Sequence, residues 1–217
     1  MKKIGILGTG MVGITLADKF LELNHEVMLG SRSATNEKSI EWAKKKPDKA
    51  KTGTYEQTAA FADILFLCVK GDAAVSTVKS LKAENLKNKT LIDITNPLDF
   101  SKGMPPILVP SLSNTNSLGE EIQKAAPEAH VVKTLNIVGA SIMVSKQKPG
   151  GNPTMFICGN NAKAKQEVTD ILHEFSWEDI IDLGDISTAR GTEMILPLWV
   201  RTMMTLGHTN FAFKAAR

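Results

Sequence analysis

Three glycines near the start of the chain have the spacing of a phosphate-binding loop. The apolar run 3–7 leads directly into the sequence GTGMVG at residues 8–13, after which apolar side chains repeat at helical spacing. In this pattern the first glycine allows a tight turn, the second lets the main chain approach a pyrophosphate, and the third lets the helix pack against the strand. The start of the helix points free N–H groups at the phosphates. The sequence therefore predicts dinucleotide contacts from Gly8, Thr9, Gly10, Met11, Val12 and Gly13.

The end of the second predicted strand, 26–29, indicates which dinucleotide is bound. It is followed by the sequence GSRS at residues 30–33, where NAD-binding folds carry a carboxylate for the ribose 2′-hydroxyl. An arginine can instead hold a 2′-phosphate with its planar fork, and Lys38 is near enough in sequence to add positive charge. The alternative for Arg32 is an ordinary solvated side chain. We expect NADP(H), held at its adenosine end by Ser31, Arg32, Ser33 and Lys38.

Polar residues follow three further predicted strands. The fourth, fifth and sixth strands are followed by Val69-Lys70-Gly71-Asp72, Thr95-Asn96-Pro97-Leu98 and Asn136-Ile137-Val138-Gly139. Ligands of this fold lie beyond the carboxyl ends of the strands, so these residues should surround the nicotinamide ribose and ring. Asn96 and Asn136 could bond the ribose or the carboxamide, with Asx turns at strand ends as the alternative. The predicted contacts are Val69, Lys70, Thr95, Asn96, Pro97 and Asn136.

The predicted cleft has no evident acid–base pair. Lys70 and Lys133 could donate a proton to a reduced carbonyl, although a surface position is favoured for Lys70. The four histidines are scattered, and neither a Ser-His-Asp arrangement nor a metal-ligand spacing is present, so no metal is expected. Hydride transfer between two stacked rings needs a dry site at near-attack distance and little from side chains. No catalytic residue is certain, and Lys133 and Asn136 are the candidates.

Alternating strands and helices predict an α/β fold with a doubly wound, mostly parallel Rossmann sheet. We assign residues 1–138 to an NADP-binding Rossmann domain and residues 139–217 to a small C-terminal α/β extension that walls the acceptor pocket. The segment 101–116, rich in Pro, Ser, Asn and Gly, is expected to be a loop over a site. A long helix from Ser187 through Met204 should be kinked or broken at Pro197.

The composition of the chain argues against nucleic acid and membranes as binding partners. The 217 residues carry a net charge of only +3, and no basic run is interleaved with aromatic residues, so nucleic acid is not expected. The first apolar run is too short for a signal peptide, and none is long enough to cross a membrane. Cys68 and Cys158 lie in apolar runs and are expected to be reduced, which indicates the cytoplasm. The last helix could form a homodimer surface or simply be core.

The chain resembles the NADPH:coenzyme F-420 (deazaflavin) oxidoreductase family, also called the NADP oxidoreductase coenzyme F-420-dependent family. The resemblance covers nearly the whole chain and rests on the motifs at 8–13, 30–32, 94–98, 117–121, 132–136 and 182–184. It implies that Thr9, Ser31 and Arg32 bind NADP and that the deazaflavin stacks on the nicotinamide beneath the residues after the fifth and sixth strands. The fold is also similar to the cytoplasmic domain of membrane metalloreductases, which pass electrons from NADPH to flavin and metal.

Three functions follow from these observations. The leading one is an enzyme that moves hydride between NADPH and a small-molecule acceptor, either the deazaflavin coenzyme F-420 or a flavin. The second is reduction of a small carbonyl compound with Lys133 as proton donor. The third is a sensor that binds NADP(H) without turnover.

Overall fold

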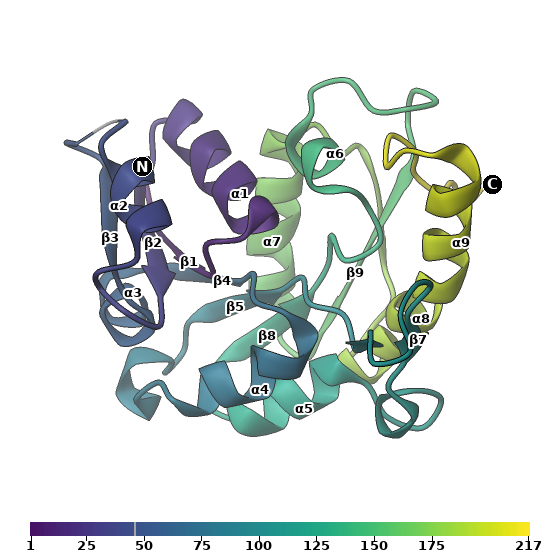
Figure 1. The fold of residues 1–217 in the computed structure, drawn as a ribbon, viewed down its shortest axis with the longest axis horizontal. Coiled ribbons are helices and arrows are strands. Elements are labelled where there is room, and N and C mark those ends of the chain that lie inside the picture. Colours follow the sequence, from purple (N-terminus) through teal and green to yellow (C-terminus); the bar gives the residue numbers. More distant parts are fainter. Residues whose placement is uncertain (46) are drawn as a thin grey trace.

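An eight-stranded sheet runs through the computed structural model, which describes residues 1–45 and 47–217 (Figure 1). In spatial order its strands are β10 (Asp179–Asp182), β9 (Thr154–Gly159), β8 (His130–Lys133), β5 (Thr90–Asp93), β4 (Ile64–Leu67), β1 (Lys3–Leu7), β2 (Glu26–Ser31) and β3 (Ala50–Thr54). Neighbouring strands are parallel except β8 and β9. The run from β3 to β8 has the strand order of dinucleotide-binding folds, which confirms the predicted fold class.

Two helical layers cover the sheet. One face carries α1 (Met11–Glu22), α2 (Glu37–Ala43), α6 (Ala140–Val144) and α7 (Ala162–Glu174), and the other carries α3 (Tyr55–Phe61), α4 (Gly71–Lys79) and α5 (Leu118–Ala125) (Figure 1). In the first layer the ring of Phe20 lies 5.1 Å from that of Phe66 and 5.2 Å from that of Phe175. Because both faces are buried, a central strand such as β4 consists entirely of apolar residues.

A small hairpin projects from the sheet between β5 and α5. It consists of the antiparallel strands β6 (Leu98–Asp99) and β7 (Ile107–Leu108), followed by the 3₁₀ turn Pro110–Leu112. The segment predicted as a loop over a site thus contains part of a hairpin. Two further 3₁₀ turns span Ala83–Asn85 and Ile186–Thr188.

The last helical segment is broken next to Pro197, as predicted. Helix α8 (Ala189–Met194) and helix α9 (Leu196–Leu206) are separated by Ile195, and Pro197 lies in the first turn of α9, where its missing N–H costs no hydrogen bond. The chain then returns to the start of β9, where the main-chain N–H of Thr154 donates to the carbonyl of Phe213 (3.0 Å). The strand direction reverses between β8, which ends at Lys133, and β9, which begins at Thr154. A domain boundary at residue 138 stays a prediction.

Candidate functional site

The glycine loop has an open cradle at the start of α1. Gly8 adopts φ 131°, and a Cβ there would lie 2.6 Å from the carbonyl oxygen of Cys68. A Cβ on Gly13 would lie 2.1 Å from the carbonyl oxygen of Gly8. By contrast, a Cβ on Gly10 would meet no described atom within 4 Å, and Gly10 precedes α1 without a side-chain cap. The N–H groups at the start of α1 therefore border open space, which is what a phosphate-binding loop requires.

Next to this cradle, the end of β2 presents Arg32 at the surface. Leu7 of β1 pairs with Gly30 of β2, so the glycine loop and the residues after Gly30 leave the sheet side by side. The buried hydroxyl of Ser31 donates to the carbonyl of Ser33 and accepts from its N–H, which closes a turn and leaves Arg32 exposed. Lys38 is exposed as well, near the start of α2. Arg32 and Lys38 thus both present exposed cationic side chains, while Ser31 builds the turn.

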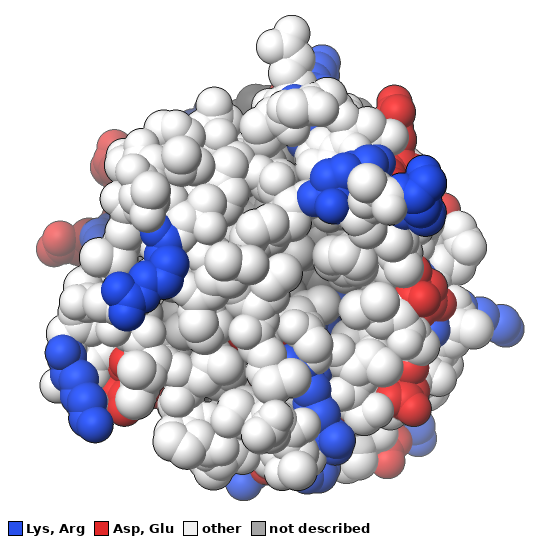
Figure 2. Space-filling view, turned by 90° about the vertical axis from the view of Figure 1, so that its right-hand side faces the viewer, with Lys and Arg blue, Asp and Glu red and all other residues white. Residues whose placement is uncertain are grey.

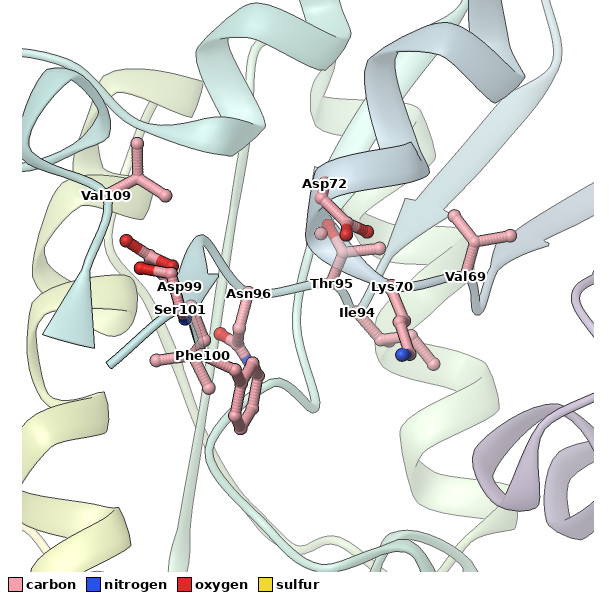
Figure 3. A pocket seen from close by; sticks show the side chains of 12 residues that line it. Val69, Lys70, Asp72, Ile94, Thr95, Asn96, Asp99, Phe100, Ser101 and Val109 are labelled. Carbon is pink, nitrogen blue, oxygen red and sulfur yellow. The ribbon is translucent and has the colours of Figure 1, made fainter. Parts of the chain in front are cut away.

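A cavity of about 640 Å³ opens beyond the carboxyl ends of β4 and β5 (Figure 3). Val69 and Lys70 lie on one side of it, residues of the β6–β7 hairpin such as Phe100 lie on the other, and Asn96 lies between them. Lys70 precedes α4 directly and is exposed. Of the six residues predicted around the nicotinamide, the structure places Val69, Lys70, Thr95 and Asn96 in this wall.

The other two, Pro97 and Asn136, are buried behind it. The Asn96 side chain donates to the carbonyl oxygen of Asn136 (2.8 Å), and the Asn136 side chain donates to Oδ1 of Asn96 (2.9 Å) and to the carbonyl oxygen of Thr192 (2.9 Å). The two amides therefore join the ends of β5 and β8 and tie both to α8. In this arrangement Asn136 supports the wall of the cavity through Asn96.

Beneath the cavity lies a buried cluster of charged side chains. Lys133 Nζ is 2.8 Å from Asp93 Oδ2, 2.8 Å from Glu193 Oε1 and 2.6 Å from the carbonyl oxygen of Thr95. All three side chains are at most 1% exposed. Asp93 Oδ1 also accepts from the N–H and the hydroxyl of Thr95. The cluster therefore holds both the N–H and the carbonyl group of Thr95.

Close contact between opposite charges offsets part of the cost of burying them in this cluster. Burial disfavours the charge of Lys133, but Asp93 and Glu193 outweigh it and raise the pKa of the ammonium group. Burial raises the pKa of Glu193, and Lys133 offsets part of that effect. Glu193 also accepts from the N–H groups of Leu118 (2.8 Å) and Gly119 (3.0 Å) at the start of α5.

This arrangement argues against the predicted role of Lys133 as a proton donor. Its ammonium group is fully engaged by three oxygen partners, and the side chain is buried beneath Thr95. Sequence reasoning did not single out Asp93 and Glu193. A signal existed for one of them, because Asp93 and Lys133 are charged residues that directly follow two apolar residues at the ends of two strands, and these positions pair in the sheet.

The strand order and the open glycine loop are those of a dinucleotide-binding protein of the Rossmann class. Comparison with known sequences identifies the family within this class: residues 3–97 match the family described as NADP oxidoreductase coenzyme F420-dependent. The F420-dependent NADP reductase of Methanocaldococcus jannaschii is 31% identical over 210 residues, which cover 91% of each chain. The chain belongs to this family.

A metalloreductase and a solved structure are also similar to nearly the whole of this chain. Metalloreductase STEAP3 of Rattus norvegicus is 27% identical over 94% of this chain, which spans only 39% of that protein. A crystal structure from Arthrobacter sp. FB24, provisionally assigned as an F420-dependent NADP reductase, superposes with a TM-score of 0.92 at 44% identity over 100% of both chains. Within the described residues, no helix is long and apolar enough to cross a membrane.

Proposed function

We propose that this protein transfers hydride between NADPH and the deazaflavin coenzyme F420. The observation that carries the proposal is the alignment of three features along one edge of the sheet. The open glycine loop follows β1, Arg32 follows β2, and the 640 Å³ cavity follows β4 and β5. Family membership supports the same pair of substrates.

In this proposal the chain contributes binding and orientation. The N–H groups at the start of α1 hold the pyrophosphate, and Arg32 with Lys38 holds the 2′-phosphate. Val69, Lys70 and Asn96 border the nicotinamide end. When bound, NADPH supplies a hydride at the nicotinamide and the deazaflavin ring accepts it. The volume of the cavity is within the range of about 300–1,000 Å³ usual for small-molecule sites.

The buried cluster gives the cavity a rigid floor. It joins β5, β8, α8 and the start of α5 beneath Thr95, so the strand ends that border the reactants are held in place. Precise placement is what a reaction between two rings requires of the protein. Glu193 belongs to this floor, and the carbonyl oxygen of Thr192 accepts from Asn136. Both contacts support the further proposal that residues 139–217 wall the acceptor pocket.

The direct test follows NADPH absorbance with F420, FMN, FAD and ferric chelates in parallel. We expect rapid oxidation with F420. Tight binding of NADPH without oxidation by any acceptor would favour the sensor, and selective reduction of a flavin would replace F420 as the acceptor.

Two further predictions concern the oligomeric state of the protein and its location in the cell. Helices α8 and α9 expose Met194, Leu198, Met204 and Leu206. The side of the molecule on which these helices lie in Figure 1 faces the viewer in Figure 2, where the middle of the surface is largely uncharged. That face is where we place the proposed homodimer contact. The cytoplasmic location also stays a prediction.

A further inference from the structure

A second cavity, distinct from the one at the nicotinamide end, lies beside Arg32. Its volume is about 390 Å³, and it is lined by Arg32, Thr54, Tyr55, Glu56, Ser76, Thr77 and Ser80. None of these residues lines the 640 Å³ cavity. Because Arg32 contributes to its wall, any dinucleotide whose 2′-phosphate is held by Arg32 has its adenine close to this space.

The strand register brings Tyr55 to the level of Arg32. Ser31 at the end of β2 pairs with Thr54 at the end of β3, so Arg32 and Tyr55 are the next residues along two neighbouring strands. Leu7 pairs with Gly30 on the other side of β2. Three adjacent strands, β1, β2 and β3, are therefore followed by the glycine loop, by Arg32 and by Tyr55. This is the order of the pyrophosphate, the 2′-phosphate and the adenine in a dinucleotide that lies across the three strand ends.

The main chain at Tyr55 is held firmly. Tyr55 is the first residue of α3 and follows a complete capping box, in which Gln57 N–H donates to Thr54 Oγ1 (3.2 Å) and Thr54 N–H donates to Gln57 Oε1 (2.8 Å). The side chain is half-buried, and burial raises the pKa of its hydroxyl while the charge of Arg32 partly opposes that shift. The ring thus extends from a fixed main-chain position and is a partly desolvated surface near the guanidinium group.

The remaining wall suits a neutral base with an amino group. Ser76 and Ser80 donate their hydroxyl protons to carbonyl oxygens of α4 (3.0 and 2.7 Å), which leaves their oxygens as acceptors. Both carboxylate oxygens of Glu56 are occupied, one by the Asn85 side chain (2.7 Å) and one by the Lys82 N–H (2.9 Å). An aromatic ring and a guanidinium group both stack on the face of a base.

We propose that Tyr55 is a substrate-binding residue that receives the adenine ring of NADP(H) in this second cavity, between its own ring and Arg32. The inference rests on the proposed use of NADP(H). Arg32 selects the 2′-phosphate, whereas Tyr55 supplies the apolar surface for the base. The two residues therefore contribute to different parts of the same substrate.

Tyr55 is the only tyrosine of the chain, which allows a direct test. Incorporation of 3-fluorotyrosine places a single ¹⁹F probe in the cavity of the otherwise unchanged protein. We expect the ¹⁹F resonance to shift on titration with adenosine 2′,5′-bisphosphate and to stay unmoved with nicotinamide mononucleotide. A resonance that does not move at saturating adenosine 2′,5′-bisphosphate would overturn the inference.

Variants supply the energetic test by calorimetry. Tyr55→Leu should weaken adenosine 2′,5′-bisphosphate and NADPH by about tenfold, since base–aromatic stacking is lost, while Tyr55→Phe should bind as the parent does. Phe61→Leu is the matched control, because it removes an aromatic ring from the same helix at a position outside the cavity. Equal affinities for Tyr55→Leu and the parent would contradict the inference alone. A parent protein that binds no NADPH would overturn the proposed function as well.

Discussion

Among single residues, the glycines of the nucleotide loop have different physical tasks. Gly8 and Gly13 are required by close main-chain packing, because added Cβ atoms would meet carbonyl oxygens at 2.6 and 2.1 Å. Gly10 lies against open space and has φ −76° and ψ 178°, which any residue can adopt. Its missing side chain therefore concerns the ligand rather than the fold.

This difference predicts opposite results for two alanine variants. Gly13→Ala should lower the free energy of unfolding by about 1–3 kcal/mol, because the rigid main chain must shift. Gly10→Ala should change it by less than about 1 kcal/mol but weaken NADPH at least about tenfold, because its methyl group occupies the cradle. Urea denaturation and calorimetry measure the two quantities. Undiminished NADPH affinity in Gly10→Ala would mean that the phosphates do not approach the chain there.

Arg32 should determine the choice between the two nicotinamide dinucleotides. Its side chain is exposed at the end of β2, where it can hold a 2′-phosphate. One charge-assisted hydrogen bond contributes about 1.5–3 kcal/mol, so Arg32→Ala should weaken NADPH by about ten- to a hundredfold and leave NADH almost unchanged. Parallel titrations of both nucleotides measure this. Equal losses for NADPH and NADH would refute the assignment.

At the level of secondary-structure elements, the buried charges of Asp93, Lys133 and Glu193 connect parts of the chain that local interactions cannot join. They link the ends of β5 and β8 to α8, and Glu193 also holds the start of α5. A buried charge without a partner is very unfavourable, so these elements keep their arrangement as a unit. The cluster thus makes the floor of the site part of the stability of the fold.

Removal of the cation from this cluster should be strongly destabilising. Lys133→Met leaves two buried carboxylates without their counter-ion and should lower the free energy of unfolding by about 3–5 kcal/mol. The matched control is Lys124→Met, whose ammonium group is also 2.8 Å from a carboxylate, that of Glu121, but is 65% exposed. That change should cost less than about 1 kcal/mol. Similar urea midpoints for both variants would contradict the role assigned to the cluster.

For the molecule as a whole, the segment 207–217 at the C-terminal end packs against β9 and β10. After α9 the chain runs back to β9 and β10, where Asp179 accepts from Lys214 (2.7 Å), Arg217 (2.5 Å) and Thr154 (2.5 Å). These hydrogen bonds hold the pKa of Asp179 well below its usual range. The ring of Phe211 stacks on Trp199 of α9 at 5.5 Å, so the tail is attached at both ends.

The lowered pKa of Asp179 predicts a pH dependence with a definite sign. Its contribution is present above the unfolded pKa of about 3.9 and is lost as the pH falls towards the folded value. Amide exchange of residues 210–217 should therefore rise, relative to α9, in acid solution below that unfolded value. Asp179→Asn should show fast exchange of the tail at neutral pH already. If residues 210–217 stay as protected from amide exchange in the variant and in acid as in the parent protein at neutral pH, Asp179 does not hold the tail in place.

The sequence alone determined the parts of the protein that depend on local patterns. The strand, glycine loop and helix at residues 3–22, the arginine after β2 and the break at Pro197 all follow from neighbouring residues, because turns, helix starts and strand periodicity are short-range effects. Only the tertiary structure decided that Lys133 is buried between two carboxylates, that Asn96 bonds Asn136, and that Tyr55 faces the same cavity as Arg32. These contacts join residues distant in sequence, and they exist because the strand register sets which side chains meet.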